Sequence, residues 1–191
     1  MVSGKFKCIY GYEIGAILGV NKRKSVMEVY LEKVNEESES KGKTHRKYEA
    51  IYWGNTLKEI MCKEFTIRSG KKVRKDPKTI IDEEYNFMYC KVDRRIVGEN
   101  SILMCIVCNG PNSYEELSEN VLLECQHNMR VTKAEKCYIA YLINDEKFIF
   151  KEVFRDENLI SKIIHEEKSF INNHIVKEIP PKELNIINHN L

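Results

Sequence analysis

The chain has 191 residues, with 31 lysines and arginines, 29 aspartates and glutamates, and 42% hydrophobic residues. This composition is typical of one ordinary folded domain and excludes collagen-like and intrinsically disordered chains. The first residues lack the pattern of a signal peptide, and no apolar run approaches the roughly 20 residues of a membrane-spanning helix. We therefore expect a cytoplasmic protein without a membrane partner.

The formal net charge of +2 hides an uneven distribution of charge along the chain. Residues 1–95 contain 21 basic and 14 acidic side chains, whereas residues 96–191 contain 10 and 15. The N-terminal half is therefore expected to carry any surface that faces an anion, and the acidic half is not.

The seven cysteines are odd in number and stand in apolar segments. This pattern predicts buried free thiols in a reducing compartment and not a disulfide framework. Cys105 and Cys108 have the spacing of half a zinc site, for which Cys125 and His127 could supply the other half. Side chains three apart on a strand or two apart on a helix point in different directions, so core packing is the favoured interpretation and no metal is expected.

The apolar pattern predicts three helices in the first part of the chain. The first spans 12–18, and the second follows Ser25, whose pairing with Glu28 is typical of a capping box. The polar stretch near 35–48 is predicted to be a mobile loop. Apolar residues then recur at helical spacing, which predicts a third helix over 56–69.

The second part of the chain is predicted to hold strands with two further helices. The expected strands are 79–82, 87–93, 95–97, 102–108, 137–143 and 147–153. The strand at 102–108 is apolar on both faces, which is typical of a central, covered strand. Ser113 and Asp156 are the expected N-caps of the two helices. This order predicts an α/β (α+β) fold with a mixed central sheet flanked by helices.

Five segments, taken in chain order, resemble the YqaJ-type viral recombinase domain, which is the phage lambda exonuclease family within the PD-(D/E)xK nuclease fold. They are 13–33, 52–73, 85–103, 122–143 and the closing helix. The resemblance implies a restriction-endonuclease-like core in a single domain over 1–175, with a C-terminal arm over 176–191. It also implies a phage or mobile-element protein, whose active relatives use Mg²⁺ to degrade one strand of duplex DNA from its end in recombination.

The family's catalytic pattern is incomplete in this sequence. It requires an Asp at a strand end, and a Glu and a Lys two residues apart on the next strand, so that both face one metal-bound phosphate. Asp93 matches the Asp, but Cys105 and Val107 occupy the other two positions. A further family acid falls at Lys58, and a small hydroxyl residue falls at Tyr12. Two other family positions are retained as Glu13 and Gln126.

One carboxylate cannot assemble an Mg²⁺ site of the family type. We therefore assign no catalytic residue, metal or cofactor, and interpret Asp93, Gln126 and Glu13 as vestigial. Mg²⁺ is expected only if a ligand has migrated from Glu99, Glu115 or Glu116. Lys58 is expected to turn toward Asp93 and replace the metal by a protein cation. The alternative is that Lys58 is exposed and the strand has drifted toward apolar packing.

Basic residues of the N-terminal half are candidates for DNA binding, because phosphates are contacted by Lys and Arg. They are Lys22, Arg23, Lys24, Arg68, Lys71, Lys72, Arg74, Arg94 and Arg95. The alternative is that these side chains only solvate the surface. Tyr52 and Trp53 could stack on a base, although core packing is favoured for Trp53.

The sequence thus predicts a catalytically degenerate exonuclease-like domain that acts by binding DNA or a protein partner. Such a partner could be a host nuclease or defence complex, which would give the domain a recombination or anti-defence role in the host cytoplasm. The alternative is an active Mg²⁺-dependent 5′–3′ double-stranded DNA exonuclease with a rearranged site. The oligomeric state is not assigned.

Overall fold

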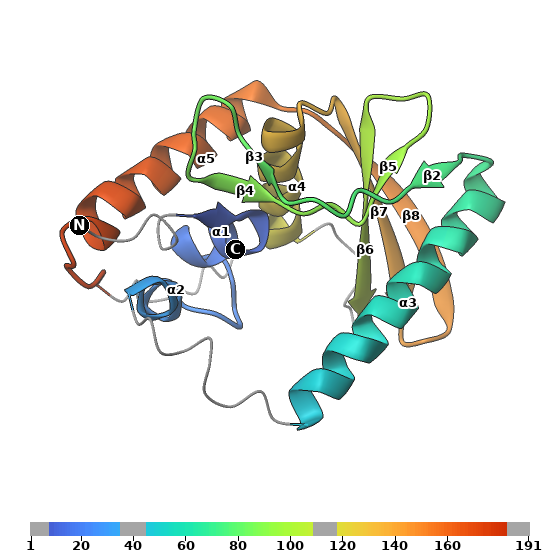
Figure 1. Ribbon diagram of the computed structural model, residues 1–191, viewed down its shortest axis with the longest axis horizontal. Helices are drawn as coiled ribbons and strands as arrows, with labels where there is room; N and C mark the ends of the chain where they lie inside the picture. The colour runs from blue at the N-terminus through green and yellow to red at the C-terminus, as the bar shows by residue number, and fades with distance from the viewer. Residues whose placement is uncertain (1–7, 35–44, 109–117, 183–191) are drawn as a thin grey trace, which may run out of the picture.

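The computed structural model describes residues 8–34, 45–108 and 118–182, with only the backbone at 45–47 (Figure 1). The helices are α1 (Gly11–Ile17), α2 (Val26–Val34), α3 (His45–Ser69), α4 (Glu119–Thr132) and α5 (Glu157–Phe170), and α5 continues into the π-helical turn η3 (Ile171–Ile175). The strands are β1 (Ile9–Tyr10), β2 (Val73–Arg74), β3 (Ile80–Ile81), β4 (Met88–Cys90), β5 (Arg94–Ile96), β6 (Ser101–Cys108), β7 (Lys136–Ile143) and β8 (Lys147–Phe154). None of the helices within these ranges is both long and apolar enough to cross a membrane.

The strands form a five-stranded sheet in the order β2-β5-β6-β7-β8 and a smaller three-stranded sheet in the order β1-β4-β3. Strands β6 and β7 are parallel, as are β1 and β4, and the other pairs are antiparallel. The apolar strand β6 therefore has neighbours on both sides, which confirms its predicted central position. The chain thus has the expected mixed α/β architecture, although it contains two sheets where one was expected.

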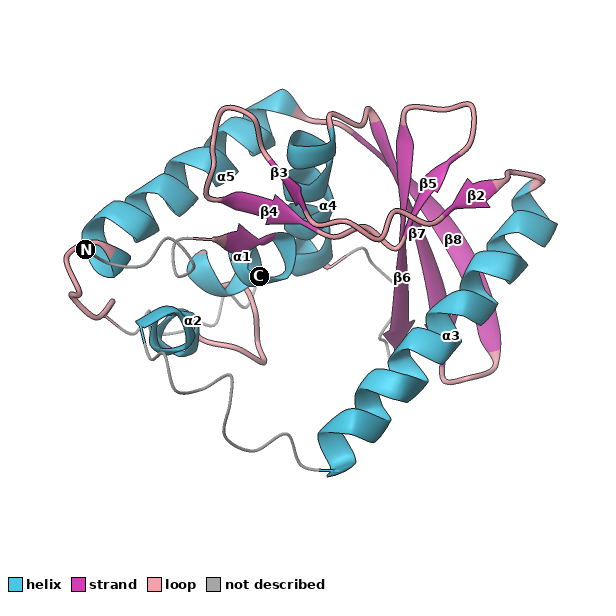
Figure 2. Cartoon of the chain, viewed as in Figure 1, coloured by secondary structure: helices cyan, strands magenta, loops and turns pink. Residues whose placement is uncertain are grey.

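Helices cover both faces of the larger sheet (Figure 2). Side chains alternate along β6, because successive residues of a strand point to opposite faces. Leu103 and Cys105 join a core with Met61 and Phe65 of α3. Met104 and its neighbours on the other face belong to the larger core, which includes residues of α1, α4 and α5. Helix α3 thus packs on one face, opposite the remaining helices.

The predicted caps of α2 and α5 are present, and a tight turn joins β7 to β8. Ser25 Oγ accepts a hydrogen bond from Glu28 N at 3.2 Å, and Glu28 Oε2 accepts one from Ser25 N at 2.7 Å, which completes the capping box. Asp156 caps α5 by accepting from two backbone N–H groups. Asn144 and Asp145 have φ of 49° and 59° between β7 and β8. Asn and Asp tolerate this left-handed conformation better than most residues, so they suit the turn.

The start of α3 differs from the prediction. The helix begins at His45 and not near Thr56, so the segment from 45 onward is not loop, while 35–44 lies outside the described residues. Ile51 and Trp53 are 50% and 54% exposed, so the core packing expected for Trp53 is wrong. Helical periodicity appears in a sequence only where one face is buried, and this part of α3 buries neither face.

Two other expectations fall partly outside the described residues. The first is the predicted N-cap Ser113, which lies outside the described residues. The N-cap of α4 is instead Ser118, whose Oγ accepts a hydrogen bond from Val121 N. Of the predicted C-terminal arm, residues 183–191 are also outside the described ranges. The division into a domain and an arm stays a prediction.

Helices α1 and α4 approach closely at a glycine. A Cβ atom placed on Gly15 would lie 1.7 Å from Asn120 Oδ1, which is far inside van der Waals contact. This packing holds α1, with Glu13 in its first turn, against the helix that carries Gln126.

Candidate functional site

Asp93 lies in the short connection between β4 and β5, next to the central strand β6. Its Oδ2 accepts a hydrogen bond from the backbone N–H of Cys105 at 2.8 Å, and its Oδ1 accepts one from Lys58 Nζ at 2.8 Å. The Asp93 side chain is 18% exposed. Both carboxylate oxygens are thus already engaged with groups of the protein.

The predicted ion pair between Lys58 and Asp93 is present. Helix α3 places Lys58 on the side of the helix that faces β5 and β6, and its side chain is 43% exposed. Burial disfavours the charged ammonium, but the charge of Asp93 and its hydrogen bond outweigh this and raise the pKa of Lys58. The ammonium therefore stays charged at neutral pH and neutralises Asp93.

The two positions that the resemblance assigns to the family's Glu and Lys contribute no charge here. Cys105 is 5% exposed, and its Sγ lies 3.7 Å from Sγ of Cys62 on α3. Val107, on the same face of β6, packs against the same core. This part of the site is therefore a thiol pair surrounded by apolar side chains.

Glu13 is also paired with a lysine. It is 1% exposed and accepts hydrogen bonds from Lys33 Nζ at 2.8 Å and from the backbone N–H of Tyr10 at 2.9 Å. Tyr12, at the position of the family's small hydroxyl residue, is 53% exposed and stacks on the Tyr10 ring. Glu13 and Asp93, the two acids that the resemblance aligns with family positions, are thus each neutralised by a lysine.

Gln126 has a structural role in this fold. Its Nε2 donates a hydrogen bond to the backbone oxygen of Phe154 at 2.8 Å, and its Oε1 accepts one from the backbone N–H of Asp156 at 2.9 Å. Gln126 thereby holds the connection from β8 to α5 against α4. Both ends of its amide are committed there, so the structure does not bring it together with Asp93.

Glu124 is a site residue that the sequence analysis missed. Burial raises the pKa of this α4 carboxyl to about 7, Lys58 and His127 oppose the shift, and Asp93 reinforces it. Glu124 therefore shares one electrostatic environment with the Lys58–Asp93 pair. The available signal was an acid between Leu123 and Cys125 in an otherwise apolar stretch.

Many of the basic candidates for DNA binding are already paired with carboxylates. Arg94 pairs with Glu59, and the other paired members of the set are Lys24, Arg68, Lys71 and Arg95. Lys22 and Arg23 are exposed in the connection from α1 to α2, and Lys72 and Arg74 are exposed beyond the end of α3. These two groups lie on different sides of the molecule in the view of Figure 1.

The thiols and histidine of the possible zinc site do not converge. Cys125 Sγ contacts Met104 Sδ, while His127 is fully buried and hydrogen-bonds Glu167 at 2.6 Å and the backbone oxygen of Tyr89 at 3.0 Å. Both ring nitrogens of His127 are therefore occupied. Within the described parts of the chain, no group of three or more His, Cys, Asp or Glu side chains is arranged to hold a metal ion.

The residues around Asp93 do not fit the Mg²⁺ site that the resemblance implies. Mg²⁺ requires hard oxygen ligands in near-octahedral geometry. Here both Asp93 oxygens accept other hydrogen bonds, positions 58 and 105 supply an ammonium and a thiol, and burial favours the protonated form of Glu124. Of the possible migrated ligands, Glu99 pairs with Lys71, and residues 115 and 116 lie outside the described ranges.

The fold is that of the phage-type exonucleases with a PD-(D/E)xK core. The alkaline exonuclease LHK-Exo from Laribacter hongkongensis shares it with a TM-score of 0.72 at 14% identity, over 93% of this chain and 92% of that chain. A phage-related exonuclease from Haemophilus somnus 129PT shares it with a TM-score of 0.64 at 12% identity, over 90% of this chain and 96% of that chain. The predicted fold class is confirmed.

The family follows from the sequence comparison. Residues 6–135 match the YqaJ-like viral recombinase domain. The uncharacterized protein YqaJ of Bacillus subtilis (strain 168) is 39% identical over 176 residues, which cover 89% of this chain and 54% of that protein. The chain belongs to the YqaJ-like viral recombinase domain family and spans about half the length of this curated relative.

Proposed function

We propose that this chain is a catalytically degenerate exonuclease-like domain that binds duplex DNA without hydrolysing it. The observation that carries the proposal is the Lys58–Asp93 ion pair, at 2.8 Å, where the family pattern calls for two acids around a metal. A cation held by Asp93 excludes a second cation from the same oxygens, because the two positive charges repel each other at short range.

Hydrolysis also lacks the other groups that the family pattern requires. Without a hard cation, nothing lowers the pKa of an attacking water or neutralises charge on the phosphate. Lys58 could supply one positive charge, but its three N–H groups can only donate hydrogen bonds and cannot accept the proton of water while charged. Binding can survive these losses, because it depends on cations that contact the phosphate backbone.

The cleavage test uses purified protein, linear duplex DNA and either Mg²⁺ or Mn²⁺. We expect the DNA to keep its length, with the wild type and Asp93→Ala giving the same result. Cleavage by the wild type that Asp93→Ala abolishes would refute the proposal and favour the alternative, an active Mg²⁺-dependent 5′–3′ exonuclease. As a positive comparison, the double variant Lys58→Glu/Cys105→Glu should gain affinity for Mn²⁺ in calorimetry, since it supplies two carboxylates next to Asp93.

The binding test uses the anisotropy of a labelled duplex over a series of salt concentrations. We expect the logarithm of the binding constant to fall linearly with the logarithm of the salt concentration, as counterions leave the DNA. Charge reversal at the exposed pairs Lys22/Arg23 and Lys72/Arg74 identifies the binding side. Reversal of the exposed Lys162 on α5 is the control. Absence of salt-sensitive binding would refute the DNA-binding part.

A protein partner is the second candidate, and the exposed apolar residues of α3 favour it. Tyr48, Ile51, Tyr52 and Trp53 are each at least half exposed in the first turns of this helix. The rings of Tyr52 and Trp53 are in contact, with centroids 5.4 Å apart, and exposed apolar surface of this kind can mark an interaction site. An anti-defence role predicts that the protein slows degradation of linear DNA by a purified host nuclease complex. Tyr52→Ser/Trp53→Ser should remove this inhibition, and Lys162→Glu, on the exposed face of α5, is the control that should keep it.

A further inference from the structure

Two cysteines face each other across the contact between α3 and β6. Sγ of Cys62 lies 3.7 Å from Sγ of Cys105, and the residues are 3% and 5% exposed. A disulfide joins its sulfur atoms at about 2.05 Å, so a movement of roughly 1.7 Å would bring the two thiols within bonding distance. A change of side-chain torsion and a small shift of the helix are of this size.

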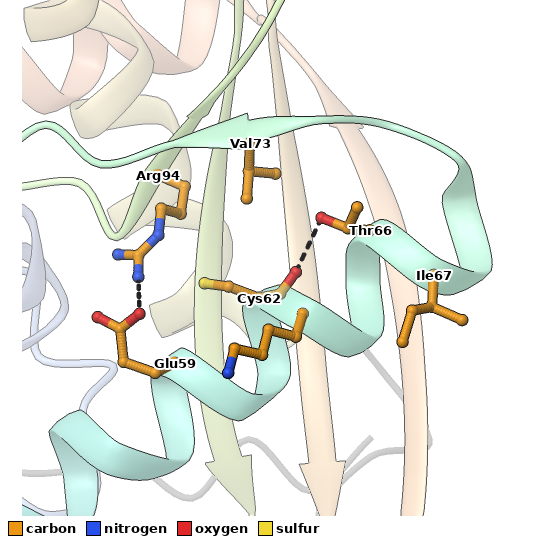
Figure 3. A pocket seen from close by; sticks show the side chains of 7 residues that line it. Glu59, Cys62, Thr66, Ile67, Val73 and Arg94 are labelled. Carbon is orange, nitrogen blue, oxygen red and sulfur yellow. Dashed lines mark hydrogen bonds and ion pairs between the residues drawn. The ribbon is translucent and has the colours of Figure 1, made fainter.

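Cys62 lies in the wall of a pocket that reaches the surface. The pocket has a volume of about 420 Å³ and is formed by α3, β2 and β5. Figure 3 shows the thiol of Cys62 pointing toward the side of the pocket where Arg94 pairs with Glu59. Ile67 in the same lining is 75% exposed, so the pocket is continuous with the outer face of α3. A small oxidant can therefore approach Cys62 from solvent.

The surroundings of the pair favour ionisation of Cys62 over Cys105. The contact with the Cys105 thiol, in which either sulfur can be the donor, and the nearby charge of Arg94 lower the pKa of Cys62. The pKa of Cys105 is raised by its contact with Cys62, by burial and by the charge of Asp93. Cys62 also lines the pocket, whereas Cys105 is not among its lining residues, so Cys62 is the thiol that meets an oxidant first.

A second close pair of thiols lies on the opposite face of the sheet. Cys125 and Cys137 are both 0% exposed and belong to the larger core. Neither of these side chains lines the pocket beside α3. Burial strongly raises the pKa of Cys137, which makes it a poor nucleophile. The Cys125–Cys137 pair therefore serves as a control for the Cys62–Cys105 pair, because the two pairs differ mainly in their access to the pocket.

We propose that Cys62 and Cys105 form a reversible disulfide, with a hydroperoxide as oxidant and a dithiol as reductant. The Cys62 thiolate attacks the peroxide, the O–O bond breaks, and a sulfenic acid forms as the other oxygen leaves in water or an alcohol. Cys105 then loses its proton and attacks this sulfur, the S–O bond breaks, and water leaves. A dithiol returns both thiols by exchange and is itself oxidised to a disulfide.

The disulfide would link α3 covalently to β6. The link would lie next to the Lys58–Asp93 pair, since the backbone N–H of Cys105 donates a hydrogen bond to Asp93. Disulfides in cytosolic proteins are usually transient and redox-sensing, which suits a pair that is reduced in the resting protein. The inference concerns the thiols alone and does not depend on whether the domain binds DNA.

The test treats the reduced protein with a small excess of hydrogen peroxide, blocks the remaining thiols with a maleimide, and measures the mass of the intact protein and of its tryptic peptides. Because Cys8 and Cys108 are only partly buried, the background variant Cys8→Ser/Cys108→Ser removes them first. We expect loss of two thiols, a cross-linked peptide pair containing Cys62 and Cys105, and full recovery with dithiothreitol.

Variants of this background separate the pair from the other thiols. Cys62→Ala should abolish the cross-link and leave Cys105 reduced, and Cys105→Ala should leave Cys62 as a sulfenic or sulfinic acid. Cys137→Ala, a buried cysteine of the other face, should keep the cross-link. Cross-linking of Cys125 to Cys137 in the folded protein, or a Cys62 that reacts no faster than Cys125, would overturn the proposal even if one of the alanine variants failed to fold.

Discussion

Replacing Glu124 by glutamine should make the protein more stable at alkaline pH and leave it unchanged at acidic pH. Burial raises the pKa of this carboxyl to about 7, compared with its ordinary value of 4.5. Between these values the folded protein keeps a proton that the unfolded chain releases, so the free energy of unfolding falls as the pH rises through this window. Each pKa unit corresponds to about 1.4 kcal/mol, and solvent screening of this partly exposed group reduces the total to about 2–3 kcal/mol.

The measurement is urea unfolding of wild type and Glu124→Gln at intervals from pH 4.5 to 8.5. Glutamine keeps the shape of the side chain and cannot ionise, so the variant should match the wild type near pH 4.5 and exceed it by about 2–3 kcal/mol at pH 8.5. The exposed Glu135, changed in the same way, should give a profile parallel to the wild type. Parallel profiles for Glu124→Gln would refute the assignment of a proton to this carboxyl.

Three further predictions concern stability in urea at pH 7. Lys58→Met should lower the free energy of unfolding by about 1–2 kcal/mol, which lies between the values for exposed and buried ion pairs, because Asp93 loses one partner while its site stays partly open to water. An unchanged urea midpoint would contradict this prediction. Gly15→Ala should cost about 1–3 kcal/mol through the clash with Asn120, and Asn120→Ala in the same chain should recover most of this. His127→Ala should cost about 3–5 kcal/mol, because a fully buried glutamate loses its partner; a loss below 1 kcal/mol would show that the pair is not formed.

The elements that the sequence predicts well are those determined by neighbouring residues or by one buried face. The capping box of Ser25 and Glu28 needs only their spacing, and the apolar strand β6 needs only its composition. The exposed half of α3 could not be found in this way, because a helix with both faces in water leaves no apolar period. Its start at His45 is therefore visible only in three dimensions.

The candidate site shows a similar division. The Lys58–Asp93 pair could be predicted because the resemblance aligned both positions with one metal. The approach of Cys62 to Cys105 could not, because the two are 43 positions apart and only the packing of α3 on the sheet sets their distance. The raised pKa of Glu124 depends in the same way on what surrounds α4, and its sequence signal is a single acid in an apolar stretch.

The Lys58–Asp93 pair also limits the mutational routes by which the domain could acquire a metal site. Lys58→Glu would remove the ammonium that now neutralises Asp93 and place a second carboxylate beside it. Cys105→Glu would place a charge in the core that Cys105 shares with Cys62 and Val107. Each single step leaves a poorly compensated charge, and only the combination can be neutralised by a bound metal. Such interdependence makes any stepwise path to a metal site cross less stable intermediates, so the Lys58–Asp93 pair is a barrier to single substitutions.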